Sequence, residues 1–254
     1  MFTISMLNMK GGVGKTTTSI NIATGIANKG YKTLLIDLDP QSNATSIFLD
    51  EDTESTTSTL IKGESTIHNS IVKVKENLWL IPSELNLAST ETEIRMQTTA
   101  PQHNRLQKAL AQIASEFDYC VIDCPPSLGL LTVNAIIASS LIIIPIKPDR
   151  FAVKAFQETI THMTNLRKNF ELSVDFKIIF TIVNRNNSEK EYIEQFKQTV
   201  EGKIFNTQIR SQPRPIIDAS SERRAVIEEL DPKVGVAEDM RQLVNEILEV
   251  FKHA

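Results

Sequence analysis

Apolar residues in this chain gather into short, nearly continuous runs that are separated by polar and glycine-containing segments. Runs of this kind are typical of strands buried on both faces of a parallel sheet, where helices cover each side. They predict strands at 2–7, 32–37, 119–123, 141–146 and 176–183, and a strand pair at 71–74 and 78–81.

Helical periodicity dominates between these runs. Leu106, Leu110 and Ile113 form a stripe at i, i+4 and i+7, which is the pattern of a helix that buries one face. Strands that alternate with helices, without an internal repeat, predict a single doubly wound α/β domain over residues 1–254, with a mostly parallel sheet flanked by helices on both faces. Further helices are expected directly after the first strand and at 58–62, 130–138, 151–166, 189–200 and 236–251.

Two polar stretches interrupt the alternation. Residues 50–66 are rich in Thr, Ser, Asp and Glu, and they are expected to form a surface insertion that carries the short helix at 58–62. Residues 89–101 are also polar and are expected to lead into the helix through Leu106. Neither stretch resembles a linker, so the single domain is expected to be continuous.

Composition adds a few constraints. A chain of 254 residues can bury one substantial core, and 41% hydrophobic with 23% charged residues is ordinary for a soluble globule. The formal charge of −4 argues against a uniformly basic surface for nucleic acid but allows a local patch. The longest apolar run, at 141–146, is far too short to span a bilayer.

The cysteines and the start of the chain favour a cytoplasmic protein. Cys120 and Cys124 lie four residues apart on a predicted strand and its end, where a disulfide between them is geometrically unfavourable, so reduced thiols are expected. The chain enters its first predicted strand at once, so neither a signal peptide nor an added DNA-reading domain is expected before it.

A glycine-rich segment joins the first predicted strand to the first helix. Residues 8–18 read Asn-Met-Lys-Gly-Gly-Val-Gly-Lys-Thr-Thr-Thr. Backbone N–H groups at such a junction can converge on phosphate oxygens, and glycine lets the backbone approach the anion closely. Lys15 would then place its charge near the β and γ phosphates, and the Thr16 hydroxyl would ligate Mg²⁺.

The same segment departs from the ordinary P-loop pattern. Met9 stands where that pattern has glycine, and a second lysine, Lys10, precedes two glycines. Lys-Gly-Gly-Val-Gly-Lys-Thr-Thr resembles the deviant Walker A box of the ParA/MinD family of P-loop ATPases. The resemblance implies that ATP binds to Lys10, Gly11, Gly12, Val13, Gly14, Lys15, Thr16 and Thr17. It also implies a homodimer in which Lys10 reaches the other subunit's nucleotide, as an arginine finger does.

Three acidic residues, Asp37, Asp39 and Asp123, lie at the ends of predicted strands. Asp123 ends an apolar strand, as a Walker B aspartate does, and Asp-Cys-Pro-Pro-Ser-Leu-Gly at 123–129 resembles the family's switch II. Asp39 matches the switch I aspartate that positions the attacking water. The resemblance therefore implies Lys10, Lys15 and Asp39 as catalytic residues, and Thr16, Asp39 and Asp123 as the metal group. Asp37 is open to two interpretations, a second-shell metal group or a capping residue.

The adenine contacts are predicted from the resemblance alone. Asn184 closes a predicted strand, and its amide could both donate to and accept from the edge of adenine. A surface asparagine in a turn is the alternative. Pro213 is expected beside the base.

Basic residues are spread over 185–224, but acidic residues are interleaved with them. On charge alone, a solvated helix face is the better interpretation of this segment. The resemblance instead implies DNA binding without sequence preference, and it favours Arg185, Lys190, Arg214 and Arg223. At one position that the family uses, this chain has Asn186. Two copies in a dimer would double the patch, and the binding would depend strongly on salt.

Three functions within the wider family compete. The resemblance favours a ParA/Soj-type ATPase for plasmid or chromosome partition, with ATP and Mg²⁺ as ligands, a ParB-like centromere-binding partner, and a nucleoid- or plasmid-associated location. A MinD-like membrane-associated ATPase would need a basic amphipathic last helix, whereas this one carries Glu246 and Glu249. An iron–sulfur reductase would need exposed cysteines on two loops, which Cys120 and Cys124 do not provide.

Overall fold

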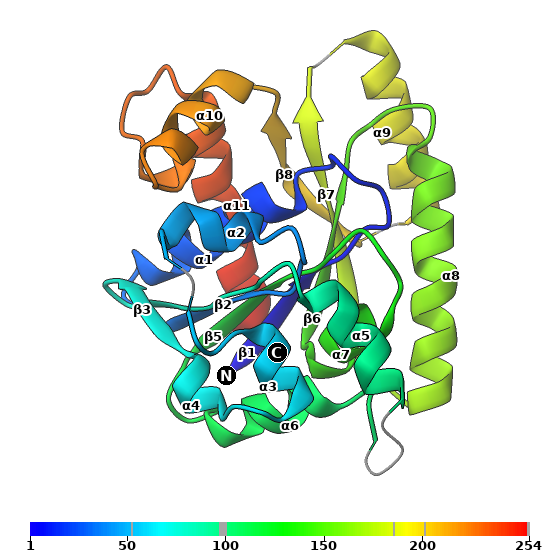
Figure 1. Cartoon of the computed structure of the whole chain (residues 1–254). Helices are drawn as coiled ribbons and strands as arrows, with labels where there is room; N and C mark the ends of the chain where they lie inside the picture. Colours follow the sequence, from blue (N-terminus) through cyan, green and yellow to red (C-terminus); the bar gives the residue numbers. More distant parts are fainter. Residues whose placement is uncertain (52, 97–100, 185, 201, 253–254) are drawn as a thin grey trace.

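An eight-stranded sheet forms the centre of the molecule (Figure 1). The computed structural model describes residues 1–51, 53–96, 101–184, 186–200 and 202–252. Within these residues the strand order is β3-β4-β2-β5-β1-β6-β7-β8, and every neighbouring pair is parallel except β3 with β4. The strands are β1 (Phe2–Met6), β2 (Thr33–Asp37), β3 (Val72–Lys75), β4 (Leu78–Ile81), β5 (Tyr119–Asp123), β6 (Leu141–Ile146), β7 (Asp175–Val183) and β8 (Ile204–Arg210).

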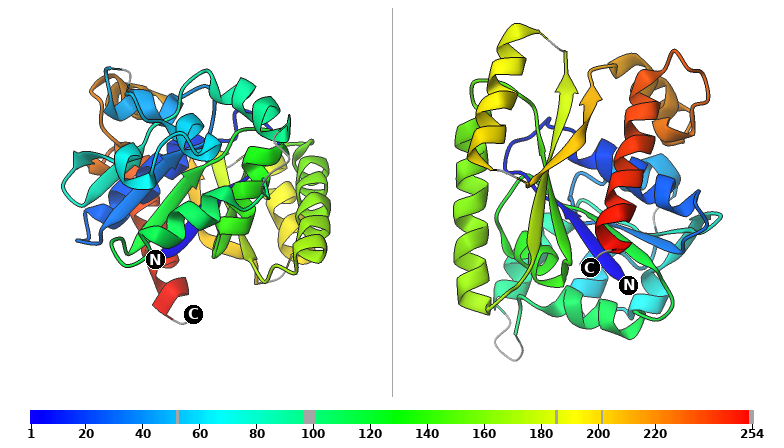
Figure 2. Two further views of the ribbon diagram at one scale, coloured as in Figure 1. Left: turned by 60° about the horizontal axis from the view of Figure 1, so that its bottom comes forward. Right: turned by 180° about the vertical axis from the view of Figure 1, so that it is seen from behind.

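Helices cover both faces of the sheet, as Figures 1 and 2 show from opposite sides. The helices are α1 (Lys15–Ala27), α2 (Asn43–Phe48), α3 (Thr57–Lys62), α4 (Ile67–Ser70), α5 (Leu87–Met96), α6 (Arg105–Gln112), α7 (Leu130–Ala138), α8 (Ala152–Phe170), α9 (Asn187–Thr199), α10 (Pro213–Ser221) and α11 (Gly235–Lys252), with a 3₁₀ turn at Val226–Glu228. One core cluster lies beneath α1 and α11, and two others lie beneath α3–α7 and α7–α9. Alternate residues of each central strand therefore enter cores on opposite faces.

The packing of α1 against α11 is unusually close at Gly25. A β-carbon at this position would lie 2.5 Å from Cδ1 of Ile227 and 2.7 Å from Cγ2 of Val244. Because both neighbours are buried, the glycine lets the helix that follows the glycine-rich loop sit tightly between the sheet and α11. The C-terminal half of α1 is thereby packed directly against α11 and the 3₁₀ turn.

The predicted fold class is confirmed, and so are the predicted strands, including the pair at 71–74 and 78–81, which the structure shows to be antiparallel as β3–β4. The prediction of a surface insertion at 50–66 is wrong in its second half. Thr57, Leu60 and Ile61 are buried, and the two aliphatic side chains belong to the core beneath α3–α7. In the sequence, the apolar character of Leu60 and Ile61 is hard to recognise because Thr and Ser residues dominate the surrounding stretch.

Several elements were not expected from the sequence. The polar segment 89–101 contributes most of α5, and its residues 97–100 lie outside the described part of the chain. The short helix α2, the edge strand β8 and helix α10 were also missed. They are short or carry many polar residues, so their periodicity is weak.

Candidate active site

The carboxyl ends of β1, β2 and β5 meet at one edge of the sheet. In the register of the parallel pairs, Asp123 of β5 lies opposite Asp37 of β2 and opposite Met6 of β1. The glycine-rich loop leaves β1 at this same edge. Open α/β sheets bind ligands at the carboxyl ends of their strands, and here the strand register alone brings the loop and two acidic residues together.

Hydrogen bonds within the loop and to neighbouring strands hold its shape. Asn8 Nδ2 donates to the carbonyl of Pro145 at 2.8 Å, and its Oδ1 accepts from the N–H of Lys10 at 2.9 Å. On the far side, the Thr181 hydroxyl donates to the carbonyl of Val13 at 2.8 Å. The loop is therefore tied to the strands β6 and β7.

Two glycines of the loop adopt left-handed backbone conformations. Gly12 has φ 69° and Gly14 has φ 81°, in the left-handed region that side chains with a Cβ disfavour. Gly14 is the N-cap of α1, and no side chain caps this helix. The first N–H groups of a helix lack partners within the helix, so this end of α1 is suited to an anion such as a phosphate.

Lys15 is the cation at the centre of the site. Only 7% of the residue is exposed, and Nζ donates to the carbonyl of Lys10 at 3.3 Å. Burial lowers the pKa of Lys15, while the nearby Asp123, Cys124 and Asp39 act in the opposite direction. Among the described residues the ammonium has one hydrogen-bond acceptor, so two of its three N–H donors remain for phosphate oxygens.

Asp123 is fully buried at the end of β5. Its Oδ1 accepts from the Ser19 hydroxyl at 3.0 Å, whereas Oδ2 has no hydrogen-bond partner among the described residues. Burial, followed by the charge of Asp37, raises the pKa of Asp123 to about 7, although the Thr16 and Ser19 hydroxyls partly oppose this. A buried carboxylate oxygen without a partner is costly unless a cation or water completes it.

The loop after β2 is organised by hydrogen bonds from Asp37. Its Oδ2 accepts from the N–H and the hydroxyl of Thr45, each at 2.8 Å, and its Oδ1 accepts from the N–H of Asp39 at 3.1 Å. Burial raises the pKa of Asp37 to about 6. Because Thr45 lies in the first turn of α2, these contacts support the capping interpretation of Asp37.

Asp39 lies at the turn of this loop and is largely buried. Its Oδ1 accepts from the N–H of Gln41 at 3.0 Å, and its main-chain carbonyl accepts from the Ser83 hydroxyl at 2.8 Å. Asp39 also contributes to the electrostatic environment of Lys15 and Asp123. The carboxylate is thus held beside both groups.

These residues fit a divalent cation of the Mg²⁺ type. Thr16 provides a hydroxyl next to Asp123, whose Oδ2 lacks a partner, and Asp39 adds a further carboxylate nearby. Oxygen ligands of this kind, several of them acting through water, are what Mg²⁺ prefers. A cation would also offset the mutual repulsion of the buried carboxylates.

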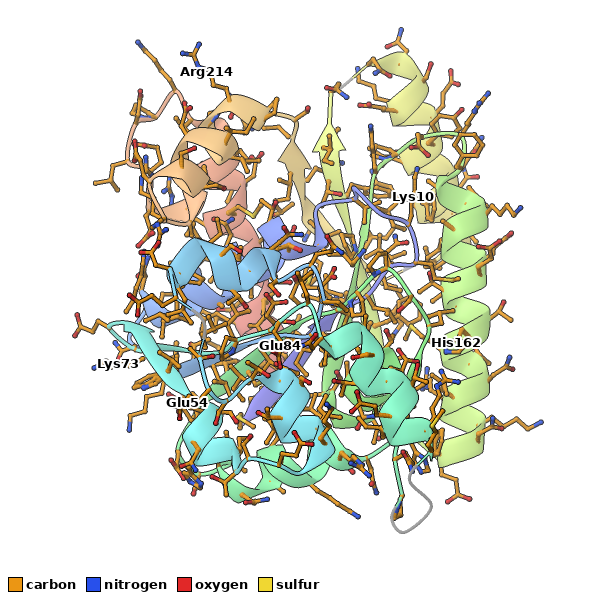
Figure 3. All side chains as sticks on the ribbon, in the orientation of Figure 1. Lys10, Glu54, Lys73, Glu84, His162 and Arg214 are labelled. Atoms are coloured by element: carbon orange, nitrogen blue, oxygen red, sulfur yellow. The ribbon has the colours of Figure 1, made fainter. Side chains whose placement is uncertain are left out.

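Lys10 has a different environment from Lys15. Nζ of Lys10 lies 2.5 Å from Oδ2 of Asp149, and each of the two side chains is 29% exposed. The ammonium also lies 5.8 Å from the ring centre of Phe151. Figure 3 shows Lys10 on the loop, at the side that faces the upper end of α8. The role of Asp149 was not predicted, because nothing in the sequence links position 149 to position 10.

The two residues predicted for adenine are placed differently from each other. Pro213 lines a mostly apolar pocket together with Gly14, Thr17 and Ile182. Asn184 is not among the residues that line this pocket, and its Nδ2 donates to Oε1 of Glu189 at 2.9 Å. The structure therefore brings Pro213, but not Asn184, to the glycine-rich loop.

The basic residues of 185–224 differ in how they are paired. Many form ion pairs within the chain, namely Lys197 with Glu194, Lys203 with Asp175, Arg210 with Asp239, Arg223 with Asp50, and Arg224 with Glu222 and Glu229.

Two of the predicted residues are more available. The Arg214 side chain is 93% exposed and its only ion pair in the described part of the chain, with Asp218, is a long one at 3.9 Å. Lys190 is exposed on α9. Figure 3 shows Arg214 projecting away from the body of the molecule. Arg185 lies outside the described residues.

Comparison with known proteins agrees with this geometry. Residues 1–178 match the AAA domain family. The chain is 34% identical over 250 residues to the sporulation initiation inhibitor protein Soj of Bacillus subtilis, covering 96% of this chain and 97% of Soj. It is 34% identical over 211 residues to the chromosome partitioning protein ParA of Myxococcus xanthus, covering 80% and 72%.

A solved structure shows the same architecture. A putative plasmid partition protein of Borrelia burgdorferi, crystallised with AMPPNP, aligns over 98% of this chain and 99% of its own with a TM-score of 0.82 and 25% identity. The alignments with Soj and with this structure span nearly the whole chain, and the predicted resemblance is confirmed. The chain belongs to the Soj/ParA family of partition ATPases.

Proposed function

We propose that this protein is a Mg²⁺-dependent ATPase of the partition type, which moves plasmid or chromosomal DNA. The observation that carries the proposal is the convergence of Lys15, Thr16, Asp39 and Asp123 at the carboxyl ends of three adjacent strands. This is an arrangement of one buried cation, one hydroxyl and acidic groups around a helix N-terminus. It matches the needs of a triphosphate with its metal.

Each residue has a role in this proposal. The N–H groups at the start of α1 and the ammonium of Lys15 would hold the phosphates, and Thr16 and Asp123 would hold Mg²⁺ beside them. Asp39 orients the attacking water. The water oxygen bonds to the γ phosphorus while the bond to the bridging oxygen breaks, and ADP, phosphate and a proton leave. Mg²⁺ supplies charge neutralisation at the phosphate oxygens.

Lys10 is the residue through which ATP would control dimerisation. In the single chain its ammonium is held by Asp149 but stays partly exposed, so it can exchange this partner for a phosphate of a second subunit. ATP would then join two subunits face to face, and hydrolysis would separate them. A slow intrinsic rate suits such a switch, because the ATP state itself carries the information.

The ATP-bound dimer is proposed to bind DNA without sequence preference through α9 and α10. Lys190 and Arg214 carry this part of the proposal, because their charges are less neutralised within the chain than those of their neighbours. A ParB-like protein is the proposed partner that stimulates hydrolysis. Arg223 contributes less, because its guanidinium is paired with Asp50.

Two other functions are less well supported. A MinD-like protein would use its last helix on a membrane, but the apolar side chains of α11 are buried, among them Leu243, Ile247 and Phe251. No helix within the described ranges is long and apolar enough to cross a bilayer. An iron–sulfur protein would need accessible thiolates, whereas Cys120 and Cys124 are both buried and burial raises the pKa of each.

DNA binding under three nucleotide conditions tests the proposal. The protein would be mixed with non-specific duplex DNA in ATP, in ADP and without nucleotide, at two salt concentrations, and vesicles of anionic lipid would be run in parallel. We expect binding to DNA with ATP only, and weaker binding at the higher salt. Binding to vesicles in place of DNA would contradict the proposal, and so would DNA binding of equal strength with ATP, with ADP and without nucleotide.

A further inference from the structure

The N-terminus of α7 has no cap from its own segment. The helix begins at Leu130, directly after Gly129, which is the N-cap and has no side chain that could accept a hydrogen bond. The loop 124–129 connects Asp123 to this point. The position of the helix start therefore fixes the far end of the loop, just as β5 fixes the near end.

A carboxylate from another helix takes the place of the missing cap. Oε1 of Glu91, on α5, accepts from the N–H of Leu130 at 2.7 Å. A β-carbon on Gly129 would lie 2.3 Å from the same oxygen. The φ of Gly129 is −81°, which any residue can adopt, so a larger residue here would conflict with the Glu91 carboxylate and would have to displace it. A negative charge at this point also complements the dipole of α7.

The helix that carries Glu91 is firmly anchored. Leu87 and Ile94 are fully buried in the core beneath α3–α7, and the Thr90 hydroxyl lies 2.5 Å from that of Ser58. Just before α5, the Ser83 hydroxyl donates to the carbonyl of Asp39 at 2.8 Å. One short segment, 83–91, thus contacts both the Asp39 loop and the end of the loop that follows Asp123.

We propose that Glu91 is a positioning residue for ATP hydrolysis, which holds the loop 124–129 at a fixed place relative to Asp39. This inference rests on the proposed function. Glu91 does not contact the groups assigned to phosphate or metal; it acts through the main chain of Leu130. Small displacements of groups around a reacting phosphate are costly, so the loss of this cap should slow hydrolysis while it leaves nucleotide binding at the start of α1 intact.

A simpler role for Glu91 would be its ion pair with Arg95. Nη2 of Arg95 lies 2.6 Å from the same Oε1, and the Arg95 side chain is 62% exposed. Exposed pairs of this kind contribute little to stability. Arg95→Ala removes the pair and leaves the bond to Leu130, which makes it the matched control.

The kinetic test compares three variants by steady-state hydrolysis and by ADP affinity. Glu91→Ala should lower kcat about tenfold, with KM for ATP and Kd for ADP within about twofold of the wild type. Glu91→Gln keeps an oxygen that can accept from Leu130, so most of the rate should return. Arg95→Ala should resemble the wild type. An unchanged kcat in Glu91→Ala, or an equal loss in Arg95→Ala, would overturn the proposal.

Hydrogen exchange provides a readout that does not depend on hydrolysis. The amides of 124–130 should exchange faster in Glu91→Ala than in the wild type, and Arg95→Ala should leave them unchanged. Loss of ADP affinity in step with kcat, with faster exchange throughout the domain, would show that Glu91 is merely structural. Failure of the proposed function can be told apart from failure of this inference. If the protein were not an ATPase, the wild type would not hydrolyse ATP, but the slow exchange of the amides at 124–130 would still report the bond from Leu130 to Glu91.

A double-mutant cycle with Gly129 sharpens the test. Gly129→Ala should displace the Glu91 carboxylate and lower kcat by a similar factor. Because both changes remove the same contact, Glu91→Ala combined with Gly129→Ala should be no slower than Gly129→Ala alone. Multiplicative losses in the double variant would contradict a shared action.

Discussion

Two regions of this molecule that carry charge are built in different ways. At the carboxyl ends of β1, β2 and β5, charged groups such as Lys15, Asp37 and Asp123 are buried and their neighbours are fixed by strand register. On α9 and α10, charged groups such as Lys190 and Arg214 are exposed. The first region is constrained by the fold, whereas the second depends on which acidic side chains lie within reach. Buried charge is therefore the more predictable of the two.

Lys15→Ala should have the largest effect, because it removes a buried cation. Truncation of one partner in a buried charge contact costs about 2–5 kcal/mol, which corresponds to a loss of ATP affinity of roughly 30-fold or more. Fluorescence titration with a labelled ATP analogue measures this. Lys10→Ala is the matched control on the same loop, and it should leave the affinity of the single chain within about threefold. Equal losses in both variants would contradict the distinction between them.

Asp123→Asn tests the buried charge through its pH dependence. Burial and Asp37 raise the pKa of Asp123 to about 7, well above the value of about 3.9 in an unfolded chain. The folded state therefore holds the proton more tightly, and stability falls as the pH rises from about 4 through 7. Without Mg²⁺, the variant should melt at a higher temperature than the wild type at pH 8, and the difference should shrink at pH 5.

The same variant has a second consequence. Ionised Asp123 is the form that would serve Mg²⁺, so the dependence of ATP affinity on Mg²⁺ should weaken in Asp123→Asn, most clearly at pH 8. Calorimetric melting curves and nucleotide titrations at the two pH values provide both measurements. A change in melting temperature that is the same at pH 5 and pH 8 would argue against a titrating carboxylate at this position.

Arg214→Glu addresses the exposed region. The change should weaken DNA binding by the ATP form by about tenfold at low salt, and because a dimer has two copies, the salt slope should fall by about two. Lys197→Glu is the control, since it reverses the same charge at a residue that is paired with Glu194. A similar loss in both variants would show that net charge, and not position, governs the binding. DNA titrations at several salt concentrations distinguish these outcomes.

Asp149→Asn should have the smallest effect. The substitution weakens the hold on Lys10 without removing a group assigned to ATP, so the subunits should dimerise at about two- to fivefold lower ATP concentration. Light scattering over a titration with ATP would measure this. An unchanged or higher requirement for ATP would mean that the pair between Lys10 and Asp149 does not restrain the single chain.

Much of the fold was predictable because buried parallel strands have a plain signature. The runs at β5 and β6 were predicted with the bounds that the structure gives them, since β6 is apolar throughout and β5 is apolar up to its last residue, Asp123. The helix α5 could not be predicted in the same way. It buries only Leu87, Thr90 and Ile94, and a helix with so few apolar residues resembles a polar loop in sequence.

The candidate active site also has parts that the sequence predicts and parts that it does not. Lys15, Thr16, Asp39 and Asp123 could be proposed from motifs, because a motif fixes the spacing of groups that act together. The contacts of Lys10 with Asp149 and of Leu130 with Glu91 join residues far apart in the chain. Nothing in a single sequence connects such positions, so only the structure reveals them. The side chain of Asn184, which was predicted to contact adenine, donates to Glu189 in the single chain, a local contact that the sequence did not indicate.

The association state of Asp39→Ala tests the central claim most directly. This variant should bind ATP without hydrolysing it, so the ATP state accumulates. Sedimentation velocity should show dimers with saturating ATP and Mg²⁺, and single chains with ADP. Adding Lys10→Ala to the same variant should return the ATP sample to single chains. Single chains of Asp39→Ala at saturating ATP would contradict the account, and the nucleotide-controlled switch would fail with it.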